Sequence, residues 1–440
     1  MDKQFNTPSL SSSTPPPKTQ NSSTPLRWSK KTKLLFLILS TIAFTTYTIY
    51  NFYYLPLSTT FPDEGRFITE ATSLYETGEH GFMGKRVWEM PFTASLYALL
   101  YAITKSTSGL IVCARLLQSI LLITQAFLIA HITKIIFHSE ASALTAFSIT
   151  LFYPFFVFYQ GLLLSETLFN TFLITGIFFL YYYFSHEFKR KRFLVLANIF
   201  LLAAIYTKGS LTVLPPVLIT TFVFLSTRSA VMTSRTAVIS VVIFVTLMSP
   251  WWLRSYLLLG EFVPFTTNSG FVLHSGHNPL NQTGGGTIGV DVEYLPEIEQ
   301  LPEYLWYKAY TQRAIDFMKE HPWKTFKLTG VKFLRFWRLY PYAEGWNSGL
   351  YKWISLLSFG VILPTAILSV YWYRQQWVRF SPLLLIIMYY TLLHMVTFAS
   401  IRYRLPLESS LIVLASPTIT YGLQSIQNVI FGYTRKLKRT

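Results

Sequence analysis

The sequence has few charged residues and almost no cysteine. Only 13% of its 440 residues are charged, whereas 51% are hydrophobic. A soluble globule of this length needs more polar surface than that, so the composition excludes an ordinary water-soluble protein and favours one that lies in a lipid bilayer. Cys113 is the single cysteine, which excludes a disulfide within the chain, and its apolar neighbours are typical of a packing role.

Long apolar segments recur along the chain. A helix needs roughly 20 residues to cross about 30 Å of hydrocarbon, and helices are expected because backbone polar groups in lipid must pair within their own segment. The stretch from Pro91 to Thr104 has 14 residues, or about 21 Å of helix, so we expect it to lie along the outer interface. The other segments predict ten spanning helices, near residues 34–55, 109–133, 142–159, 167–184, 193–208, 211–226, 236–253, 351–372, 381–400 and 405–423.

The basic residues fall on one side of this arrangement. The net charge is +17, which could indicate a nucleic acid partner, so its position along the chain decides its meaning. The predicted cytoplasmic segments carry 19 Lys and Arg against three acids, Asp2, Glu140 and Glu187. This positive-inside distribution places both ends of the chain in the cytoplasm, and no nucleic acid is needed to explain the charge.

The spans divide the chain into five parts, two of which hold long loops on the outer face. Loops of this length are usually functional. We expect a disordered cytoplasmic tail at 1–33, an N-terminal transmembrane module at 34–253 with a first outer loop at 57–108, a second outer loop at 254–350, the C-terminal transmembrane helices at 351–423 and a basic cytoplasmic tail at 424–440.

Both outer loops contain amphipathic patterns. In the first, a helix is predicted to start after Pro62 and to stop at Gly78. In the second, a helical pattern from Tyr304 to Arg338 is rich in Trp, Phe, Lys and Arg, which is typical of a helix at a membrane interface. The predicted fold is thus an all-α polytopic membrane protein with interfacial helices in two outer loops.

Four carboxylates lie near the predicted outer face. Asp63 and Glu64 follow the first span, where an acid can equally be an ordinary helix cap. Glu89 opens the interfacial segment, where it could simply be solvated among headgroups. Glu166 lies among apolar residues at the end of a span, so it is a functional candidate; a structural ion pair with Arg115 is the alternative.

Four basic residues share this face: Lys208, Arg254, Arg402 and Arg404. Each alone could be an interface anchor whose charged end reaches the headgroups. Together with the carboxylates, they are the set expected where a membrane-anchored phosphate is bound beside a general base.

Two further features of the second outer loop are less specific. His274 and His277, with Glu89, could hold a divalent metal ion, although two histidines three residues apart are a weak signal. The run Gly284 to Gly286 could let backbone amides approach a phosphate, but it lacks the Lys and Ser/Thr of a nucleotide-binding loop and is better interpreted as a flexible loop.

The order of these motifs resembles that in the GT-C glycosyltransferases, and within them the bacterial branch related to protein O-mannosyltransferases and the lipid A aminoarabinose transferase. The resemblance covers residues 34–423. It rests on Pro62-Asp63-Glu64, Glu89-Met90-Pro91, Leu164-Ser165-Glu166, Pro250-Trp251-Trp252-Leu253-Arg254, Gly276-His277-Asn278-Pro279 and Arg402-Tyr403-Arg404-Leu405-Pro406.

The resemblance implies a polyprenyl-phosphate sugar donor, a glycan, lipid or protein acceptor on the non-cytoplasmic side, and inversion at the anomeric carbon. A bacterial inner membrane, with the site on its periplasmic or extracellular side, would fit. Asp63, Glu64 and Glu166 are then the expected catalytic carboxylates, and Arg254, Arg402, Arg404 and Lys208 the expected phosphate ligands. Relatives often have lysine where this sequence has Met90.

Two other classes of function remain open at this point. A transporter or flippase of lipid-linked sugars would carry polar groups through the membrane, whereas the middle of the predicted spans is nearly free of charge. A non-catalytic membrane scaffold is the third alternative. No cofactor other than a divalent metal ion is suggested.

Overall fold

Within residues 27–342 and 348–437, which its computed structural model describes, the protein is built of helices and the loops that join them. Those residues contain no β-strand, only two isolated bridges. The all-α prediction is therefore confirmed. The tail expected at 1–33 lies mostly outside the described residues, and its last four residues already belong to the first helix, which Ser29 caps.

Within the described residues, the structure consists of α-helices and short 3₁₀ or π-helical turns. In order they are α1 (Lys30–Ile49), a π-helical turn η1 (Tyr50–Tyr54), α2 (Pro62–Thr77), α3 (Phe92–Thr104), α4 (Thr107–Phe137), α5 (Glu140–Phe152), α6 (Pro154–Gln160), α7 (Glu166–Ser185), α8 (Lys191–Thr207), η2 (Gly209–Leu211), α9 (Leu214–Thr227), α10 (Ala230–Leu259), α11 (Asn268–Gly276), α12 (Pro296–Glu299), α13 (Glu303–Glu320), α14 (Pro322–Phe336), α15 (Gly349–Trp372), η3 (Arg374–Gln376), α16 (Trp377–Val396), η4 (Ile401–Arg404) and α17 (Leu405–Leu437).

The protein is a multi-pass membrane protein by the length and composition of its helices. Six of the described helices can cross a bilayer: α1 with η1, α4, α7, α10, α15 and α16 with η3. α5 and α6 can form a seventh span bent by 48°, where Pro154 interrupts the helix. The other three predicted spans coincide with α8, α9 and α17, of which α8 and α9 have 17 and 14 residues.

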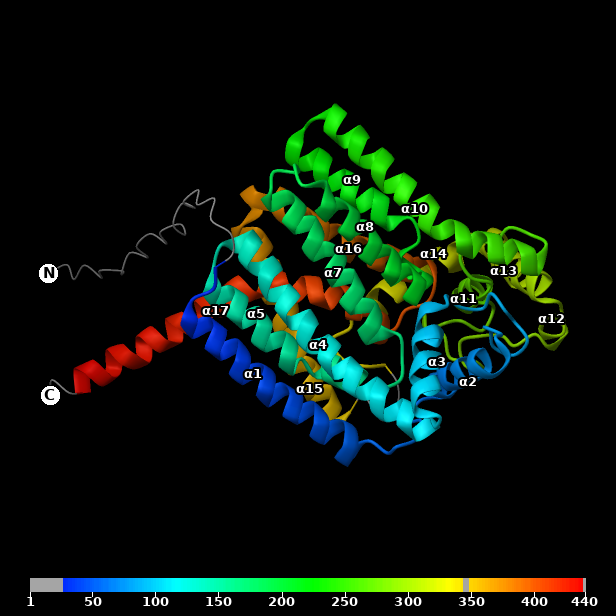
Figure 1. The fold of residues 1–440 in the computed structure, drawn as a ribbon, viewed down its shortest axis with the longest axis horizontal. Coiled ribbons are helices and arrows are strands. Elements are labelled where there is room, and N and C mark those ends of the chain that lie inside the picture. The colour runs from blue at the N-terminus through cyan, green and yellow to red at the C-terminus, as the bar shows by residue number, and fades with distance from the viewer. Residues whose placement is uncertain (1–26, 343–347, 438–440) are drawn as a thin grey trace, which may run out of the picture.

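The long helices form one bundle, and the loop helices gather at one of its ends. Figure 1 shows α2, α3 and α11 to α14 together at the right, while α1 begins and α17 ends toward the left. The 31 residues of α4 make about 46 Å of helix, which exceeds the bilayer core and carries the helix into the loop region. The two ends of the described chain thus share one side, as the charge distribution predicts.

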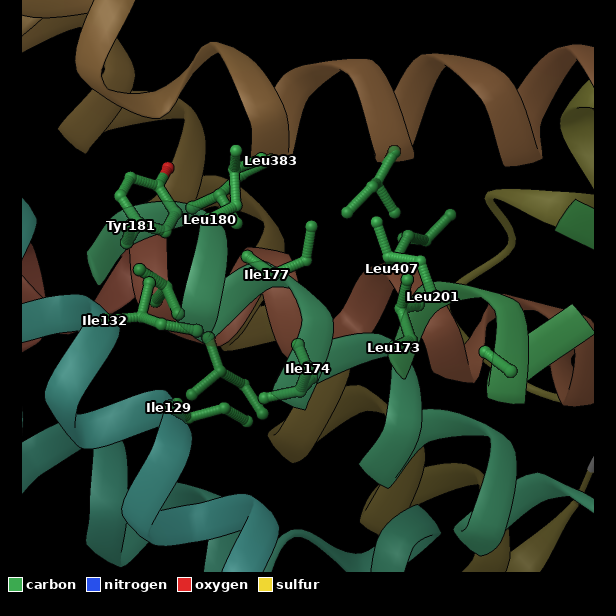
Figure 2. Close-up of a cluster of buried hydrophobic side chains, with 14 of the residues drawn as sticks. Ile129, Ile132, Leu173, Ile174, Ile177, Leu180, Tyr181, Leu201, Leu383 and Leu407 are labelled. Carbon is green, nitrogen blue, oxygen red and sulfur yellow. The ribbon is translucent and has the colours of Figure 1, made fainter. Parts of the chain in front are cut away.

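α7 lies at the centre of the apolar core. Figure 2 shows its Leu173, Ile174, Ile177 and Leu180 among side chains from α4, α8, α16 and α17. Gly176 permits the close approach of α8, since a Cβ atom there would come within 2.6 Å of the Leu201 side chain. This central helix carries Glu166 at its N-terminal end.

The helix of the first outer loop has the predicted ends. Pro62 occupies its first turn, where a missing backbone N–H costs nothing. Gly78 ends it in the left-handed conformation, with φ of 73°, which glycine adopts without strain. Phe67 and Ala71 face the core that α2 forms with α3 and α4.

The structure adds detail to the predictions for the second outer loop and the C-terminal segment. The pattern from Tyr304 to Arg338 forms two helices, α13 and α14, because Pro322 starts a new helix instead of continuing the first. α14 buries Lys332 and Phe336 and exposes Trp323, Phe326 and Leu334. The predicted basic tail after residue 424 begins as a continuation of α17, which runs to Leu437.

Candidate active site

Four segments far apart in the sequence bring one charged residue each to the loop end of the bundle. Asp63 lies in the first turn of α2, Glu166 begins α7, Lys208 follows α8, and Arg402 lies in η4 between α16 and α17. The short 3₁₀ turn η4 leads directly into α17, and residues 397–400 join it to α16.

Arg402 joins two carboxylates. Its Nη1 atom lies 2.5 Å from Asp63 Oδ2 and its Nε atom 2.6 Å from Glu166 Oε1. Lys208 Nζ lies 3.1 Å from the same Glu166 oxygen and 4.7 Å from the centre of the Tyr403 ring. Two cations and two anions therefore form one network, which we call the Arg402 network.

Exposure differs across the Arg402 network. The Glu166 side chain is 4% exposed, Arg402 20%, Lys208 29% and Asp63 41%. Burial acts to lower the pKa of Arg402, but Glu166, Tyr403 and Asp63 outweigh it and raise that pKa well above its usual value. A permanently charged guanidinium thus lies between a buried carboxylate and one that solvent can reach.

Glu166 is positioned by the segment before α7, in which side chains satisfy the backbone. Burying an irregular segment requires partners for its peptide groups. Four side chains from α2, α3 and α4 supply those partners. Arg115 Nε donates to the Gly161 carbonyl, Gln118 Nε2 to that of Leu162 and Tyr97 Oη to that of Leu164, while the Leu163 N–H donates to Glu64 Oε1. The start of α7 is held rigidly as a result.

Glu64, expected among the catalytic carboxylates, is the residue that caps α2. It is fully buried, and its Oε2 accepts the N–H groups of Thr60 and Phe61 at 2.6 and 2.8 Å. Because Glu64 satisfies the helix start, Asp63 is not needed as the cap and pairs with Arg402 instead. Glu64 is thus a positioning residue in this structure.

Arg115 does not pair with Glu166, contrary to the alternative drawn from the sequence. Its guanidinium donates to the carbonyl oxygens of Gly161 and Asn51. Glu166 takes its cations from Arg402 and Lys208. The ion-pair partner lies 236 residues away along the chain, which no spacing argument could have indicated.

Two of the four expected phosphate ligands are engaged elsewhere. Arg404 is fully buried, with its Nε atom 2.5 Å from Glu408 Oε1 and its guanidinium 3.4 Å from the centre of the Phe359 ring. Arg254 donates to the backbone carbonyl oxygens of Arg86 and His80. Arg404 is closed to a ligand, and Arg254 supports the first outer loop.

Glu89 belongs to a second cluster that the sequence prediction missed in part. Arg66 Nη1 lies 2.7 Å from Glu89 Oε1, and Glu70 is 1% exposed with neither carboxylate oxygen paired within the described residues. Burial and the charge of Glu89 raise the pKa of Glu70 to about 8, while Arg66 acts in the opposite sense. Asp63, Arg66 and Glu70 share one face of α2 through their spacing of three and four residues, a signal that could have found them.

The proposed metal ligands do not come together. His274 contacts the Glu293 carbonyl and His277 that of Val396, while Glu89 pairs with Arg66. Residues 27–342 and 348–437 hold no group of three His, Cys, Asp or Glu side chains that could bind a metal ion. The two histidines instead hold the second outer loop in place.

The glycine run is packed and not an open flexible loop. A Cβ atom on Gly285 would come within 2.4 Å of Asp291 Oδ2, and one on Gly286 within 2.6 Å of the Phe398 ring. The Ala399 N–H donates to the Gly284 carbonyl at 2.9 Å. These glycines let the second outer loop lie against the chain that leads into η4, so they support Arg402 indirectly.

The bundle with its loop helices and charged site defines the chain as a helical membrane protein. No family model matches its sequence, and no curated protein matches it either. Among solved structures, it is similar to the oligosaccharyltransferase AglB from Archaeoglobus fulgidus in complex with an inhibitory peptide and a dolichol-phosphate. That match has a TM-score of 0.54 at 12% identity and covers 93% of this chain and 52% of AglB.

Two further structures are similar at lower scores. The A. fulgidus oligosaccharyltransferase with Zn and sulfate gives a TM-score of 0.48 at 12% identity, over 92% of this chain and 51% of the other. ArnT from Cupriavidus metallidurans bound to undecaprenyl phosphate gives 0.46 at 14% identity, over 90% of this chain and 79% of ArnT. The chain spans about half the length of AglB. The predicted resemblance to GT-C glycosyltransferases is confirmed as a likeness of fold.

Proposed function

We propose that the protein is a membrane glycosyltransferase. It transfers a sugar from a polyprenyl-phosphate donor to a hydroxyl group of a glycan, lipid or protein, with inversion, on the non-cytoplasmic side of a bacterial inner membrane. The observation that carries this proposal is the Arg402 network, in which one guanidinium joins a half-exposed and a buried carboxylate.

Asp63 suits the role of general base. It is the most exposed acid of the Arg402 network, and Glu64 relieves it of capping α2. In the proposed step it takes the proton of the acceptor hydroxyl as that oxygen bonds to the anomeric carbon. The bond from the anomeric carbon to the phosphate oxygen breaks, and the electron pair leaves with the polyprenyl phosphate.

Arg402 and Lys208 suit the stabilisation of that leaving phosphate. A lysine ammonium carries three donors and a guanidinium five, so both can bind further oxygens while they hold Glu166. Charged donors fixed before the reaction stabilise negative charge as it develops. Of the four phosphate ligands expected from the sequence, this proposal keeps Arg402 and Lys208 and leaves out Arg404 and Arg254, because the latter two are engaged with Glu408 and with backbone carbonyls.

The likeness to AglB supports the donor class. That protein was solved with a dolichol-phosphate, a lipid whose long isoprenoid chain ends in a phosphate. The membrane-spanning bundle provides apolar surface for such a chain, and the Arg402 network lies at the bundle end where the loop helices gather. A donor that is lipid at one end and a charged sugar at the other fits this combination.

The test begins with mass spectrometry of glycolipids and glycoproteins from a deletion strain, which identifies donor and acceptor. Purified protein is then assayed for transfer from the radiolabelled donor. We expect Asp63→Asn to reduce turnover by about 10²-fold or more. Glu76→Gln is the matched control, because Glu76 is an exposed acid on the same helix, and it should leave turnover unchanged.

Full activity of the Asp63→Asn protein would remove Asp63 from the mechanism. A second assay measures movement of the lipid-linked sugar across liposomes that contain the purified protein. Translocation without transfer would replace the proposed enzyme by a transporter.

A further inference from the structure

A groove lies between α1 and α4, at the opposite end of the bundle from the Arg402 network. Its volume is about 440 Å³, within the range of roughly 300–1,000 Å³ found for small-molecule sites. Its apolar walls are Phe36 and Leu37 of α1 with Ile123 and Phe127 of α4. Leu37 is 64% exposed, so the groove opens sideways from two membrane-spanning helices toward the space that lipid chains occupy.

One end of the groove is polar and ordered. Trp28 Nε1 donates to His131 Nε2 at 3.0 Å, and the other nitrogen of His131 contacts the Phe127 carbonyl at 2.8 Å. His131 is thereby fixed as a neutral ring that accepts from the tryptophan. Lys33 lines the same end, and the Ser40 hydroxyl is buried along the groove with no hydrogen-bond partner within the described residues.

The polar end is positively charged. Arg27, Lys30, Lys31 and Lys33 are all exposed and lie within five residues of Trp28, which lines this end of the groove. The neighbouring acid, Glu140, is already neutralised by Lys134 at 2.8 Å. A ligand here must therefore be apolar along most of its length and negatively charged at one end.

We propose that this groove binds one anionic phospholipid of the cytoplasmic leaflet. Its phosphate lies at Lys33, and an acyl chain runs between Phe36 and Phe127. The site does not depend on the proposed glycosyltransferase activity, because the groove lies at the start of α1, whereas the Arg402 network lies where α2 and α7 begin. It anchors the start of α1 against α4 at the cytoplasmic surface.

The experiment uses the full chain in nanodiscs of dioleoyl phosphatidylcholine with dioleoyl phosphatidylglycerol, followed by native mass spectrometry of the lipids that the protein retains. We expect one retained phosphatidylglycerol per chain, in preference to phosphatidylcholine. Lys33→Gln should reduce this preference about fivefold, as expected for one cation at a membrane surface. Leu37→Trp should block retention by filling the groove, and monodisperse elution shows that each variant is folded.

Lys31→Gln is the control for diffuse charge, because Lys31 is an exposed lysine two residues from Lys33 that does not line the groove. Its retention should match that of the wild type. An equal loss in the Lys31 and Lys33 variants would show a diffuse basic surface and overturn the proposal. So would equal retention of both lipids, or displacement of phosphatidylglycerol from this groove by farnesyl phosphate, which would make it a polyprenyl-phosphate site.

Discussion

Arg402 and Arg404 are two residues apart and have opposite environments. Arg402 is 20% exposed and divides its donors between Asp63 and Glu166. Arg404 is fully buried, pairs with Glu408, and donates to the carbonyl oxygens of Arg338 and Phe336. Both belong to the single motif Arg402-Tyr403-Arg404.

The difference separates a site from its support. Arg404 and Glu408 have no route to solvent, so they fix η4 and the start of α17 in the bundle. Arg402 is then presented at the surface of that fixed turn. We therefore expect changes at Arg404 to act mainly on stability and changes at Arg402 mainly on activity.

The largest effect on stability is expected at the buried pair of Arg404 and Glu408. Arg404→Met leaves the buried carboxylate of Glu408 without its cation, which typically costs about 3–5 kcal/mol. The melting temperature in detergent should fall steeply. The double variant Arg404→Met with Glu408→Leu should recover most of the loss, since apolar side chains can replace a buried pair. If the double variant is no more stable than the single one, the pair has another role.

The next effect concerns Arg402, the partly exposed arginine of the two. Arg402→Gln should lower turnover by about 10²–10³-fold, as for the loss of one preorganised donor. Its melting temperature should change far less than that of Arg404→Met. Arg402→Lys should keep part of the activity, because an ammonium retains the charge but not the fork that reaches both acids. Arg374→Gln, an exposed arginine at the other end of α16, serves as the control. Unchanged turnover in Arg402→Gln would make the Arg402 network purely structural.

A smaller effect is expected at Glu64, which supports both segments that carry acids. The two carboxylate oxygens of Glu64 accept from three backbone N–H groups. Glu64→Gln replaces one oxygen by an amide that cannot accept, so it should lower the free energy of unfolding by about 1–3 kcal/mol. Turnover should fall through displacement of Asp63 and Glu166, without a shift in the pH profile. The exposed Glu76→Gln change should stay within about 0.5 kcal/mol. A shifted pH profile in Glu64→Gln would indicate a direct role in proton transfer.

The last effect is spread over several pH units, as a pH dependence of stability that arises from Glu70. Its pKa is raised from 4.5 to about 8 in the folded protein. The free energy of unfolding is highest below about pH 4.5 and falls as the pH rises toward 8, by about 1.4 kcal/mol per pH unit between these values. It falls because Glu70 ionises more readily in the unfolded chain, so rising pH favours that state. Glu70→Gln should flatten the dependence of melting temperature on pH in that window. An unchanged slope would mean that Glu70 finds a cation in solution.

Local signals along the chain were sufficient for much of the fold. Pro62 and Gly78 bound α2 because each constrains the backbone at its own position. Pro154 and Pro322 break helices for the same reason, although the sequence prediction did not place a break at either. The candidate site was predicted in part. Asp63, Glu166, Lys208 and Arg402 lie together, as expected. Glu64 instead caps α2, Arg254 donates to backbone carbonyls, and Arg404 pairs with Glu408.

The sequence by itself determined that this chain lies in a membrane, that its two ends share one side of the bundle, and where most of its helices begin and end, because hydrophobic length, charge asymmetry and proline or glycine act locally. Only the tertiary structure decided that Arg402 opens to the site while Arg404 closes on Glu408, and that Glu64 frees Asp63 by capping the helix itself. Glu408 is four residues from Arg404, but the burial of that pair and the partners of Arg402 depend on segments far away along the chain, up to 339 residues for Asp63, and no local pattern records that distance.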